Sequence, residues 1–369
     1  MIRLENVTRL FDNVAAVDGF SLEVDQGEVC VLIGPSGCGK TTTLRLINRL
    51  VEPTSGTILV NGRDVSRTKA EVLRRSIGYA IQSVGLFPHM TVGANIGVVP
   101  GLLGWGKERI SARVNELLEL VGLEPRQYAP KYVSQLSGGE AQRVGVARAL
   151  AADPPILLMD EPFGAVDPLT RQRLQVQFLR IQRKLKKTII LVTHDLDEAI
   201  RLADRIAVMQ SGRLVQHDSP ERILASPANK FVHDFVGVDR ALKRLSRISV
   251  EEFIRPTPSV TTSATREELS AAIGGHRSVW VVDGDGRPIG WIDRASLRDP
   301  GQLNDITVRA DPAEMYVTGS DTLHGALSRM LGLGFKSLPA VDDNGRLIGE
   351  ITLGDIEKAT ARGENMDHV

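Results

Sequence analysis

The sequence predicts an α/β domain with a mostly parallel sheet, followed by a smaller α+β unit that repeats itself. Three observations lead to this prediction. Short aliphatic runs alternate with helical patterns in the first part of the chain, this alternation ends near Phe235, and a strand–turn–strand pattern then occurs twice. With 369 residues the chain is long enough for two or three compact domains.

The first domain is predicted from its strands. Residues 29–33, 156–159 and 189–192 are short aliphatic runs, each closed by a polar or glycine-rich turn. Such runs are typical of strands that are buried on both faces of a parallel sheet. Helical patterns, including 41–50 and 139–152, lie between them.

Other patterns frame this domain at its two ends. Residues 3–7 and 20–24 alternate in polarity and are expected to form antiparallel edge strands. Residues 238–248 place apolar and basic side chains on separate helical faces, which predicts an amphipathic linker helix. The apolar face would hold Val238, Ala241, Leu242, Leu245 and Ile248, and the basic face Arg240, Lys243, Arg244 and Arg247.

Beyond the linker, the sequence repeats at a constant offset. Residues 281–290 (VVDGDGRPIG) match residues 340–349 (AVDDNGRLIG), 59 positions later. Each copy reads as a strand, an Asp-Gly or Asn-Gly hairpin turn, and a second strand. Two copies are too few for a solenoid, so we expect a pseudo-symmetric pair that shares one core.

Composition argues against several classes of protein. The 45 basic and 45 acidic residues cancel, unlike in a strongly basic nucleic-acid-binding domain. The two cysteines, Cys30 and Cys38, show no disulfide or metal-ligand spacing, so a reducing compartment is expected. The charged N-terminus does not read as a signal peptide. Residues 76–106 carry no charge but hold seven glycines and two prolines, which disfavours a membrane span and leaves a candidate surface for a membrane partner.

A phosphate-binding loop is predicted at residues 34–42, between a buried strand and a helix. Its glycines let backbone N–H groups face phosphates, and the helix N-terminus favours anions. Lys40 is expected to reach the β- and γ-phosphates, and the Thr41 hydroxyl to bind Mg²⁺. The expected nucleotide contacts are Gly34, Ser36, Gly37, Cys38, Gly39, Lys40, Thr41 and Thr42.

A pair of carboxylates complements this loop at the end of the aliphatic run 156–159. Asp160 is expected to hold Mg²⁺, mainly through water. Glu161 is expected to act as the general base that polarises the attacking water. Alone, the pair would read as an ordinary solvated strand end; after a phosphate-binding loop it predicts nucleotide hydrolysis.

The segment 136–140, Leu-Ser-Gly-Gly-Glu, makes the chain resemble the ABC ATPase family over about its first 236 residues. Ser137, Gly138 and Gly139 precede a helix and provide a second anion-binding device. The resemblance implies that this device binds the γ-phosphate of ATP held by another subunit, so that a homodimer would enclose two ATP molecules. Three positions depart from the family's usual residues: Glu140 for Gln, Val166 for Leu and Phe11 for Tyr.

Further site residues follow from the same resemblance. Gln82 would be the Q-loop residue, contacting Mg²⁺, and Asp167 the D-loop residue. His194 would be the switch histidine, acting in catalysis with Gln82 and Glu161. Phe11 falls where the family stacks an aromatic ring on adenine. Taken singly, His194 reads as a satisfied strand-end histidine and Phe11 as a core aromatic, so the ordered set of motifs carries the specificity.

The C-terminal repeat resembles a tandem pair of CBS modules. These modules often bind adenine nucleotides through a Thr/Ser-x-x-Asp pair that holds the ribose, and Thr352 and Asp355 fit that pattern. The first copy has Asp293 and Ser296 instead. The resemblance therefore implies at most one good site per pair, for an adenine nucleotide or a cyclic dinucleotide. A ligand-free dimerisation module fits the same residues, and the basic face of the linker could instead sense ionic strength near anionic lipid.

Together these features predict a P-loop ABC ATPase domain, with an antiparallel edge subdomain and a helical subdomain beside a mostly parallel sheet, followed by an α+β tandem CBS pair. The expected boundaries are 1–236 for the ATPase domain, 237–248 for the linker helix, 249–308 and 309–361 for the two CBS modules, and 362–369 for a tail.

The end of the first domain, the segment 81–89 and the C-terminal repeat most resemble the ATP-hydrolysing subunits of osmoprotectant importers. Those importers move quaternary amines such as glycine betaine, choline or carnitine. The resemblance implies ATP and Mg²⁺, permease subunits as partners, an extracytoplasmic substrate-binding protein as an indirect partner, and no nucleic acid. It also implies a peripheral position on the cytoplasmic face of the inner membrane, with segment 85–92 receiving a helix of the permease.

Two alternatives remain open. An importer ATPase for another small solute, such as an amino acid, fits the same motifs, since an ATPase subunit does not touch the cargo. A nucleotide-sensing regulatory protein with a vestigial ATPase is the second, and intact Lys40, Asp160, Glu161 and His194 speak against it.

Overall fold

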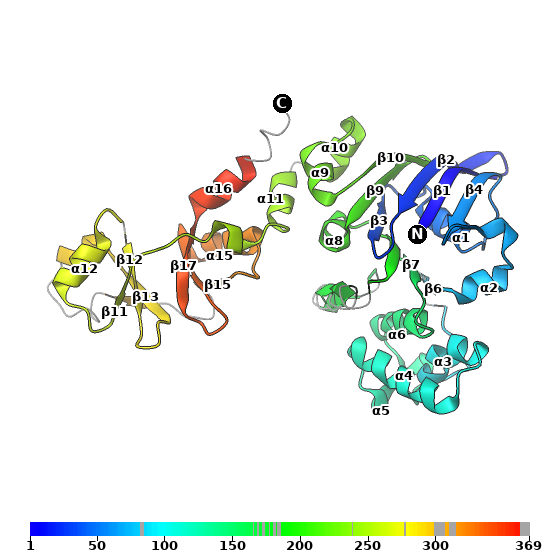
Figure 1. The fold of residues 1–369 in the computed structure, drawn as a ribbon, viewed down its shortest axis with the longest axis horizontal. Helices are drawn as coiled ribbons and strands as arrows, with labels where there is room; N and C mark the ends of the chain where they lie inside the picture. Colours follow the sequence, from blue (N-terminus) through cyan, green and yellow to red (C-terminus); the bar gives the residue numbers. More distant parts are fainter. Residues whose placement is uncertain are drawn as a thin grey trace. The chain divides into compact units, whose positions relative to one another are not determined.

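The computed structural model describes the chain except for residues 82–84, 165, 168–169, 172–173, 177, 180–181, 183–185, 238, 277, 299–306, 310–314 and 362–369. It divides into two compact units, Met1–Gly237 and Val238–Val369 (Figure 1).

A six-stranded sheet, in the order β10-β9-β3-β8-β7-β6, forms the centre of the first unit. β3 pairs in parallel with β8 and β9, and β7 pairs in parallel with β8 and β6, whereas β10 is antiparallel to β9. The strands are β3 (Val29–Ile33), β6 (Ile77–Ala80), β7 (Ile156–Asp160), β8 (Thr188–Val192), β9 (Arg205–Gln210) and β10 (Arg213–Asp218).

Every residue of β3, β7 and β8 is buried, which confirms the three predicted buried strands. Successive residues of β3 enter different hydrophobic cores: Val31 belongs to one core and Leu32 to the other. A strand with a core on each face needs apolar residues at every position, because its side chains alternate between the two faces.

A second, four-stranded sheet has the order β2-β1-β4-β5 and consists of β1 (Ile2–Phe11), β2 (Val14–Val24), β4 (Ser55–Val60) and β5 (Arg63–Asp64). The prediction of antiparallel strands at 3–7 and 20–24 is correct. The prediction that both are edge strands is wrong for β1, because β4 returns later in the chain and pairs with its other side.

Helices complete the first unit. Figure 1 shows α3 to α6 gathered in a helical subdomain, and the uncharged segment 76–106 contributes β6 and α3. In the described part of the chain, no helix is both long and apolar enough to span a membrane. The helices are α1 (Lys40–Ile47), α2 (Ala70–Arg75), α3 (Val92–Leu102), α4 (Lys107–Leu120), α5 (Pro125–Tyr128), α6 (Gly138–Leu150), α8 (Leu196–Leu202), α9 (Pro220–Ala225) and α10 (Lys230–Val236), with 3-10 turns η1 (Val65–Arg67) and η2 (Val133–Gln135).

The second unit contains the predicted pair of hairpins. β12 (Ser278–Val282) and β13 (Pro288–Asp293) recur as β16 (Ser337–Val341) and β17 (Leu347–Thr352), at the offset of 59 found in the sequence. The remaining elements are β11 (Ser259–Thr261), β14 (Val308–Arg309), β15 (Val317–Thr318), α11 (Arg240–Leu245), α12 (Arg266–Ile273), α15 (Leu323–Leu333), α16 (Leu353–Ala361), η3 (Val250–Phe253) and η4 (Arg294–Arg298).

Two expectations for this unit are wrong. The repeats do not share one core: one cluster surrounds Val281 and Ile292, and another surrounds Ala340 and Ile351. The linker helix α11 spans six residues, not 238–248, and Leu242 on its expected apolar face is 46% exposed. Only Leu245 of this helix is buried, so a single turn and a half of helix supplies one anchor rather than a continuous apolar stripe.

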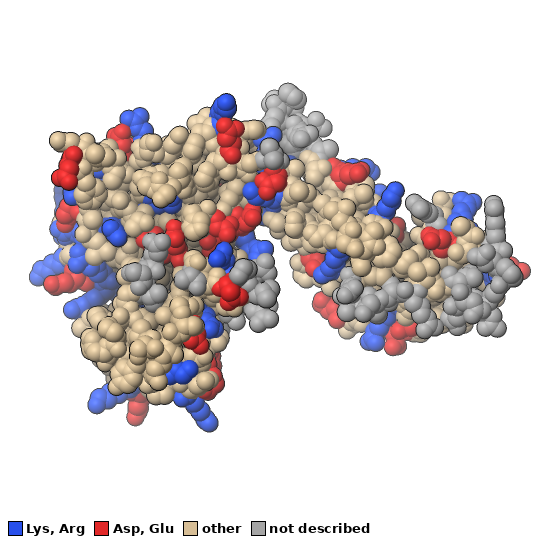
Figure 2. All heavy atoms as spheres, turned by 180° about the vertical axis from the view of Figure 1, so that it is seen from behind, with Lys and Arg blue, Asp and Glu red and all other residues tan. Residues whose placement is uncertain are grey.

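On the face shown in Figure 2, basic and acidic side chains are interspersed over both units, in line with the balanced composition. In α11, Lys243 pairs with Asp239 at 3.0 Å, so part of the basic face contacts an acidic neighbour within the chain.

Gly349 permits a close approach of two segments that the sequence does not link. Arg255 and Glu350 exchange both backbone hydrogen bonds at 2.9 Å, and a Cβ on Gly349 would lie 2.3 Å from the Arg255 carbonyl oxygen. We expect Gly349→Ala to lower the free energy of unfolding of the second unit by about 1–3 kcal/mol, measured by urea denaturation. Gly332→Ala, in a helix with open space at its Cβ, is the matched control; equal stability of the two variants would contradict the packing argument.

Candidate functional site

The predicted phosphate-binding loop lines a cavity of about 430 Å³ at the carboxyl ends of the parallel strands. This is where ligands bind in open α/β sheets. Gly39 forms the N-cap of α1 with φ 103°, and a Cβ there would lie 2.2 Å from the Ala16 carbonyl oxygen. The lining residues are Ala16, Ser36, Gly37, Cys38, Gly39, Lys40, Thr41, Thr42, Glu161 and His194.

Lys40 is held across the loop by backbone carbonyls. Its Nζ donates hydrogen bonds to the oxygens of Gly34 at 2.7 Å and Pro35 at 2.9 Å, and the residue is buried. Burial of an ammonium is tolerated because these carbonyls satisfy its donors. The loop is thus closed around the charge that is expected to meet the phosphates.

Thr41 joins the loop to the neighbouring strand. Its hydroxyl donates a hydrogen bond to Oδ1 of Asp160, the last residue of β7, at 3.1 Å. A hydroxyl and a carboxylate side by side offer the oxygen ligands that Mg²⁺ prefers, with room for water and phosphate oxygens to complete an octahedron. The residues present therefore fit the predicted metal.

The electrostatics of Asp160 agree with a site for a cation. Burial raises the pKa of its carboxyl, and the negative charge of Glu161 raises it further, whereas the hydrogen bond from Thr41 opposes the shift. The ionised carboxylate is therefore costly in this fold, and a bound cation would relieve that cost.

Glu161 is fixed by its backbone beyond the end of β7. Its φ is 48°, its N–H donates to the Val192 carbonyl at 2.9 Å, and its own carbonyl accepts from Gln142 Nε2 at 2.8 Å. His194 Nδ1 lies 3.1 Å from Glu161 Oε1. The structure thus brings the predicted base and the predicted switch histidine into contact beside the phosphate loop.

A buried polar network supports the loop that carries His194. Thr193 Oγ1 donates to Glu198 at 2.5 Å, and Gln175 Nε2 donates to the same carboxylate at 3.4 Å. Burial raises the pKa of Glu198. Asp195 caps α8 by accepting from the N–H groups of Asp197 and Glu198.

The segment Ser137–Glu140 forms a capping box at the start of α6, with Ser137 as N-cap and Glu140 as its reciprocal partner. Tyr128 also donates to Glu140 at 2.5 Å, and this hydrogen bond is the largest cause that lowers the pKa of Glu140 to about 2. The departure from Gln to Glu thus fastens the helix start with a carboxylate. Ser137, Gly138 and Gly139 do not line the phosphate cavity of the same chain.

The other predicted site residues are distributed as follows. Asp167 is exposed and its carboxylate accepts from the Thr170 N–H at 3.0 Å. Phe11 is 41% exposed, with the Arg9 guanidinium 4.4 Å from its ring centroid, and Ala16 rather than Phe11 lines the phosphate cavity. Gln82 lies outside the described residues.

Three contributors were missed from the sequence: Ala16 in the cavity wall, Gln142 at the Glu161 carbonyl and Tyr128 at Glu140. No local pattern marks them, since each acts only through a tertiary contact.

In the second unit, Thr352 and Asp355 bond to each other. Asp355 Oδ2 accepts from the Thr352 hydroxyl at 2.6 Å and from its N–H at 3.1 Å, and the Arg255 guanidinium contacts the other carboxylate oxygen. Asp355 is buried, whereas Thr352 lines a cavity of about 390 Å³. Of the predicted pair, only the threonine faces the space where a ligand would lie.

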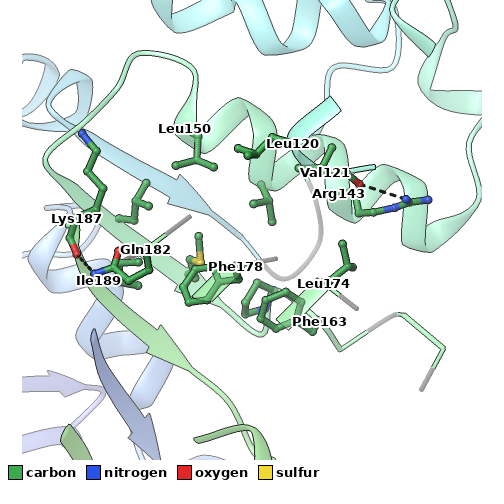
Figure 3. Close-up of a pocket in the computed structure, with 14 residues that line it drawn as sticks. Leu120, Val121, Arg143, Leu150, Phe163, Leu174, Phe178, Gln182, Lys187 and Ile189 are labelled. Atoms are coloured by element: carbon green, nitrogen blue, oxygen red, sulfur yellow. Dashed lines mark hydrogen bonds between the residues drawn. The ribbon is translucent and has the colours of Figure 1, made fainter. Parts of the chain in front are cut away.

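An apolar cavity of about 40 Å³ lies behind the carboxylate pair, on the side away from the phosphate loop (Figure 3). Phe163 and Phe178 meet edge to face there, with centroids 6.1 Å apart, and Leu174 lies beside them. A space of this size holds at most a few small atoms, so it reads as a packing gap and not as a ligand site.

Comparison with known proteins decides the family. A model described as ABC transporter matches residues 17–164, and a model described as CBS domain matches residues 250–299 and 305–362. The chain is 49% identical over 362 residues to the osmoprotectant import ATP-binding protein OsmV of Salmonella typhimurium, covering 95% of this chain and 94% of that protein. The chain belongs to the ABC transporter family.

It is an ABC-type ATPase with C-terminal CBS domains. The chain is also 44% identical to the glycine betaine/carnitine/choline transport ATP-binding protein OpuCA of Bacillus subtilis, over 95% of this chain and 94% of that one. Among solved structures, the dimeric bacterial ABC transporter cassette MJ0796 matches with a TM-score of 0.56 and 33% identity, covering 59% of this chain and 98% of that one. A post-hydrolysis state of that cassette with ADP and Pi matches with a TM-score of 0.55 and 31% identity over the same shares.

Asp160 is expected to trade stability for cation binding in this ABC ATPase. Because its pKa is raised in the fold, the penalty is absent below the usual pKa of the carboxyl and fully present above the raised pKa, so it applies at neutral pH. We expect Asp160→Asn to raise the melting temperature without nucleotide by roughly 2–4 °C, the shift that about 1 kcal/mol produces. It should abolish the further stabilisation by Mg²⁺ and ATP.

Differential scanning calorimetry with and without Mg²⁺-ATP measures both effects, with the exposed Asp343→Asn as control. A variant that is less stable than the parent without nucleotide, or that keeps the Mg²⁺-dependent stabilisation, would show that Asp160 has another role.

Proposed function

We propose that this ABC ATPase powers an importer for osmoprotectants of the quaternary-amine class, such as glycine betaine, choline or carnitine. The observation that carries the proposal is the similarity along 95% of the chain, CBS domains included, to OsmV and OpuCA, whose names state osmoprotectant import and glycine betaine/carnitine/choline transport. The alternative, another small solute, has no such observation in its favour.

We further propose that the active form is a dimer. The phosphate cavity contains the loop, Glu161 and His194, but not the anion-binding helix start at Ser137–Gly139. ATP held by Lys40, Thr41 and Thr42 would leave its γ-phosphate toward solvent, where the signature segment of a second copy would meet it. The match to a dimeric cassette supports this arrangement.

In the proposed mechanism, Glu161 takes a proton from the attacking water as that water approaches the γ-phosphorus. His194, 3.1 Å from Glu161, holds that carboxylate and faces the same cavity, so it can hydrogen-bond the transferring phosphoryl group. Lys40 stabilises charge on the phosphate oxygens, as do the backbone N–H groups of the loop. Mg²⁺ held beside Thr41 and Asp160 would supply further positive charge. Gln82 and Asp167 would complete the site, and Phe11 would contact the adenine.

A second cavity of the first unit is a candidate docking groove for the permease. Its volume is about 390 Å³, and Leu50 and Phe87, both more than two-fifths exposed, contribute apolar surface to it. Arg148 holds the adjacent backbone by donating to the Gly85 carbonyl at 2.7 Å. The groove includes part of the uncharged segment. An exposed apolar groove of this kind suits a partner helix, and it would place the chain peripherally at the cytoplasmic face of the inner membrane.

The CBS modules are proposed to regulate the ATPase, with the predicted boundaries 249–308 and 309–361. The cavity beside Thr352 is the proposed place for an adenine nucleotide or cyclic dinucleotide. Asp355 would act by positioning Thr352, to which it is hydrogen-bonded.

Removing the proposed base should stop hydrolysis and leave binding intact. We expect Glu161→Gln to lower the ATP turnover rate by roughly 10²–10⁴-fold, the usual contribution of a general base. The variant should still bind ATP and should accumulate as a dimer in size-exclusion chromatography with ATP, while the exposed Glu119→Gln behaves as the parent. Unimpaired turnover in Glu161→Gln would remove Glu161 from its role.

The cargo is tested by uptake of labelled glycine betaine, choline, carnitine and methionine into cells with and without this chain, at low and high osmolarity. We expect loss of the quaternary amines, largest at high osmolarity, with methionine uptake unchanged. Unchanged uptake of all three amines would overturn the osmoprotectant proposal and leave the ATPase in place.

A further inference from the structure

Three aromatic side chains meet in the second unit at a place that the nucleotide chemistry does not use. Trp280 and Trp291 are in contact across β12 and β13, with ring centroids 6.1 Å apart and planes at 67°. Trp291 and Phe335 are 4.9 Å apart with planes at 80°. Only 4% of the chain is aromatic, so this concentration is unusual for the protein.

These rings line a cavity of about 240 Å³, together with Asp293 and Met315. Trp280 is buried and its ring N–H donates to Glu350 at 3.2 Å. Because the only polar atom of that ring already has a partner, what it can offer a ligand is the π-system. The cavity thus combines aromatic walls set at steep angles with a carboxylate.

The related cavity beside Thr352 shows how far this site has diverged. The two cavities share Ser278, Lys336 and Ser337. At the repeat offset of 59, Phe335, Trp291 and Asp293 stand where the other cavity has His276, Glu350 and Thr352. The threonine that would hold a ribose is thus replaced by an acid, and two polar residues are replaced by rings.

We propose that the aromatic cavity binds a small quaternary ammonium solute. Steeply inclined aromatic faces attract a trimethylammonium group through cation–π interactions, and a carboxylate adds direct attraction. The same carboxylate would repel phosphates. The volume lies below the range typical of drug-sized ligands, which favours a small solute over a nucleotide.

The polar side of the cavity suits a zwitterion. Lys336 lines it with Ser278 and Ser337, and an ammonium with hydroxyl groups matches a carboxylate such as that of glycine betaine. A betaine would place its trimethylammonium group against the rings and its carboxylate toward Lys336. The choice of this solute rests on the proposed function, since it would make the cargo a ligand of the ATPase chain that drives its import.

Binding is measured by titration calorimetry on the purified full-length chain with glycine betaine and choline, and with 3,3-dimethylbutan-1-ol, the uncharged isostere of choline. We expect both cations to bind, and the neutral isostere to bind about tenfold more weakly or not at all, because it lacks the charge. In a Trp105→Phe background the remaining tryptophans are Trp280 and Trp291, so quenching of their fluorescence reports on the cavity itself.

Two variants locate the site. Trp291→Leu removes a wall, and Asp293→Asn removes the charge while keeping the shape; each should weaken binding about tenfold with unchanged ATP turnover. Trp105→Leu, which removes a ring that contacts Arg109 in the first unit, is the matched control and should bind as the parent.

Binding of neither cation, equal binding of the neutral isostere, or undiminished binding by both cavity variants would each overturn the proposal. Fluorescence changes produced only by adenine nucleotides would overturn it as well. These outcomes leave the proposed cargo untouched, because cargo is decided by the uptake measurement; conversely, lost uptake with no binding would refute this inference alone.

Discussion

The site depends on the parallel pairing of three fully buried strands. β3, β8 and β7 run side by side, so the loop after β3, the carboxylates after β7 and the histidine after β8 emerge at one edge of the sheet. A register shift in any of them would move Lys40, Glu161 or His194 by a residue spacing of about 3.3 Å, more than the length of a hydrogen bond. The two hydrophobic cores on opposite faces of β3 fix that register, because a shift of one residue would exchange the side chains that each core receives.

Within this frame, the site spends stability on function. Asp160 is kept in a buried position beside another acid, which favours its protonated form, and the hydrogen bond from Thr41 offsets only part of that cost. Glu161 adopts a left-handed backbone conformation that is uncommon for a side chain of this kind. Both features lie at the carboxyl end of β7, where the hydrogen bonds from Gln142 and to Val192 hold the backbone in place.

The sequence allowed those parts to be predicted that depend on short, local patterns. The buried strands, the phosphate loop, the start of α6 and the repeated hairpins follow from aliphatic runs, glycine spacing and turn residues, and the structure has them. The interior place of β1, the separate cores of the repeats and the short helix α11 could not be read in this way, because they depend on which segments pair across the chain. The same holds for Gln142 and Tyr128, whose side chains act on residues that sequence spacing does not connect to them, and for the divergence of the two CBS cavities, where a substitution of threonine by Asp293 was visible but the rings around it were not.

The two carbonyls that hold Lys40 have a consequence for ligand selectivity. Gly34 and Pro35 act as internal competitors for its ammonium group, so an anion gains only the difference between its own attraction and theirs. A single weak phosphate contact would gain little by this exchange, whereas a polyphosphate that also engages the loop N–H groups and a metal ion recovers the loss several times over. The loop therefore behaves as a threshold device, whose response to a chain of phosphates is steeper than its response to any one of them.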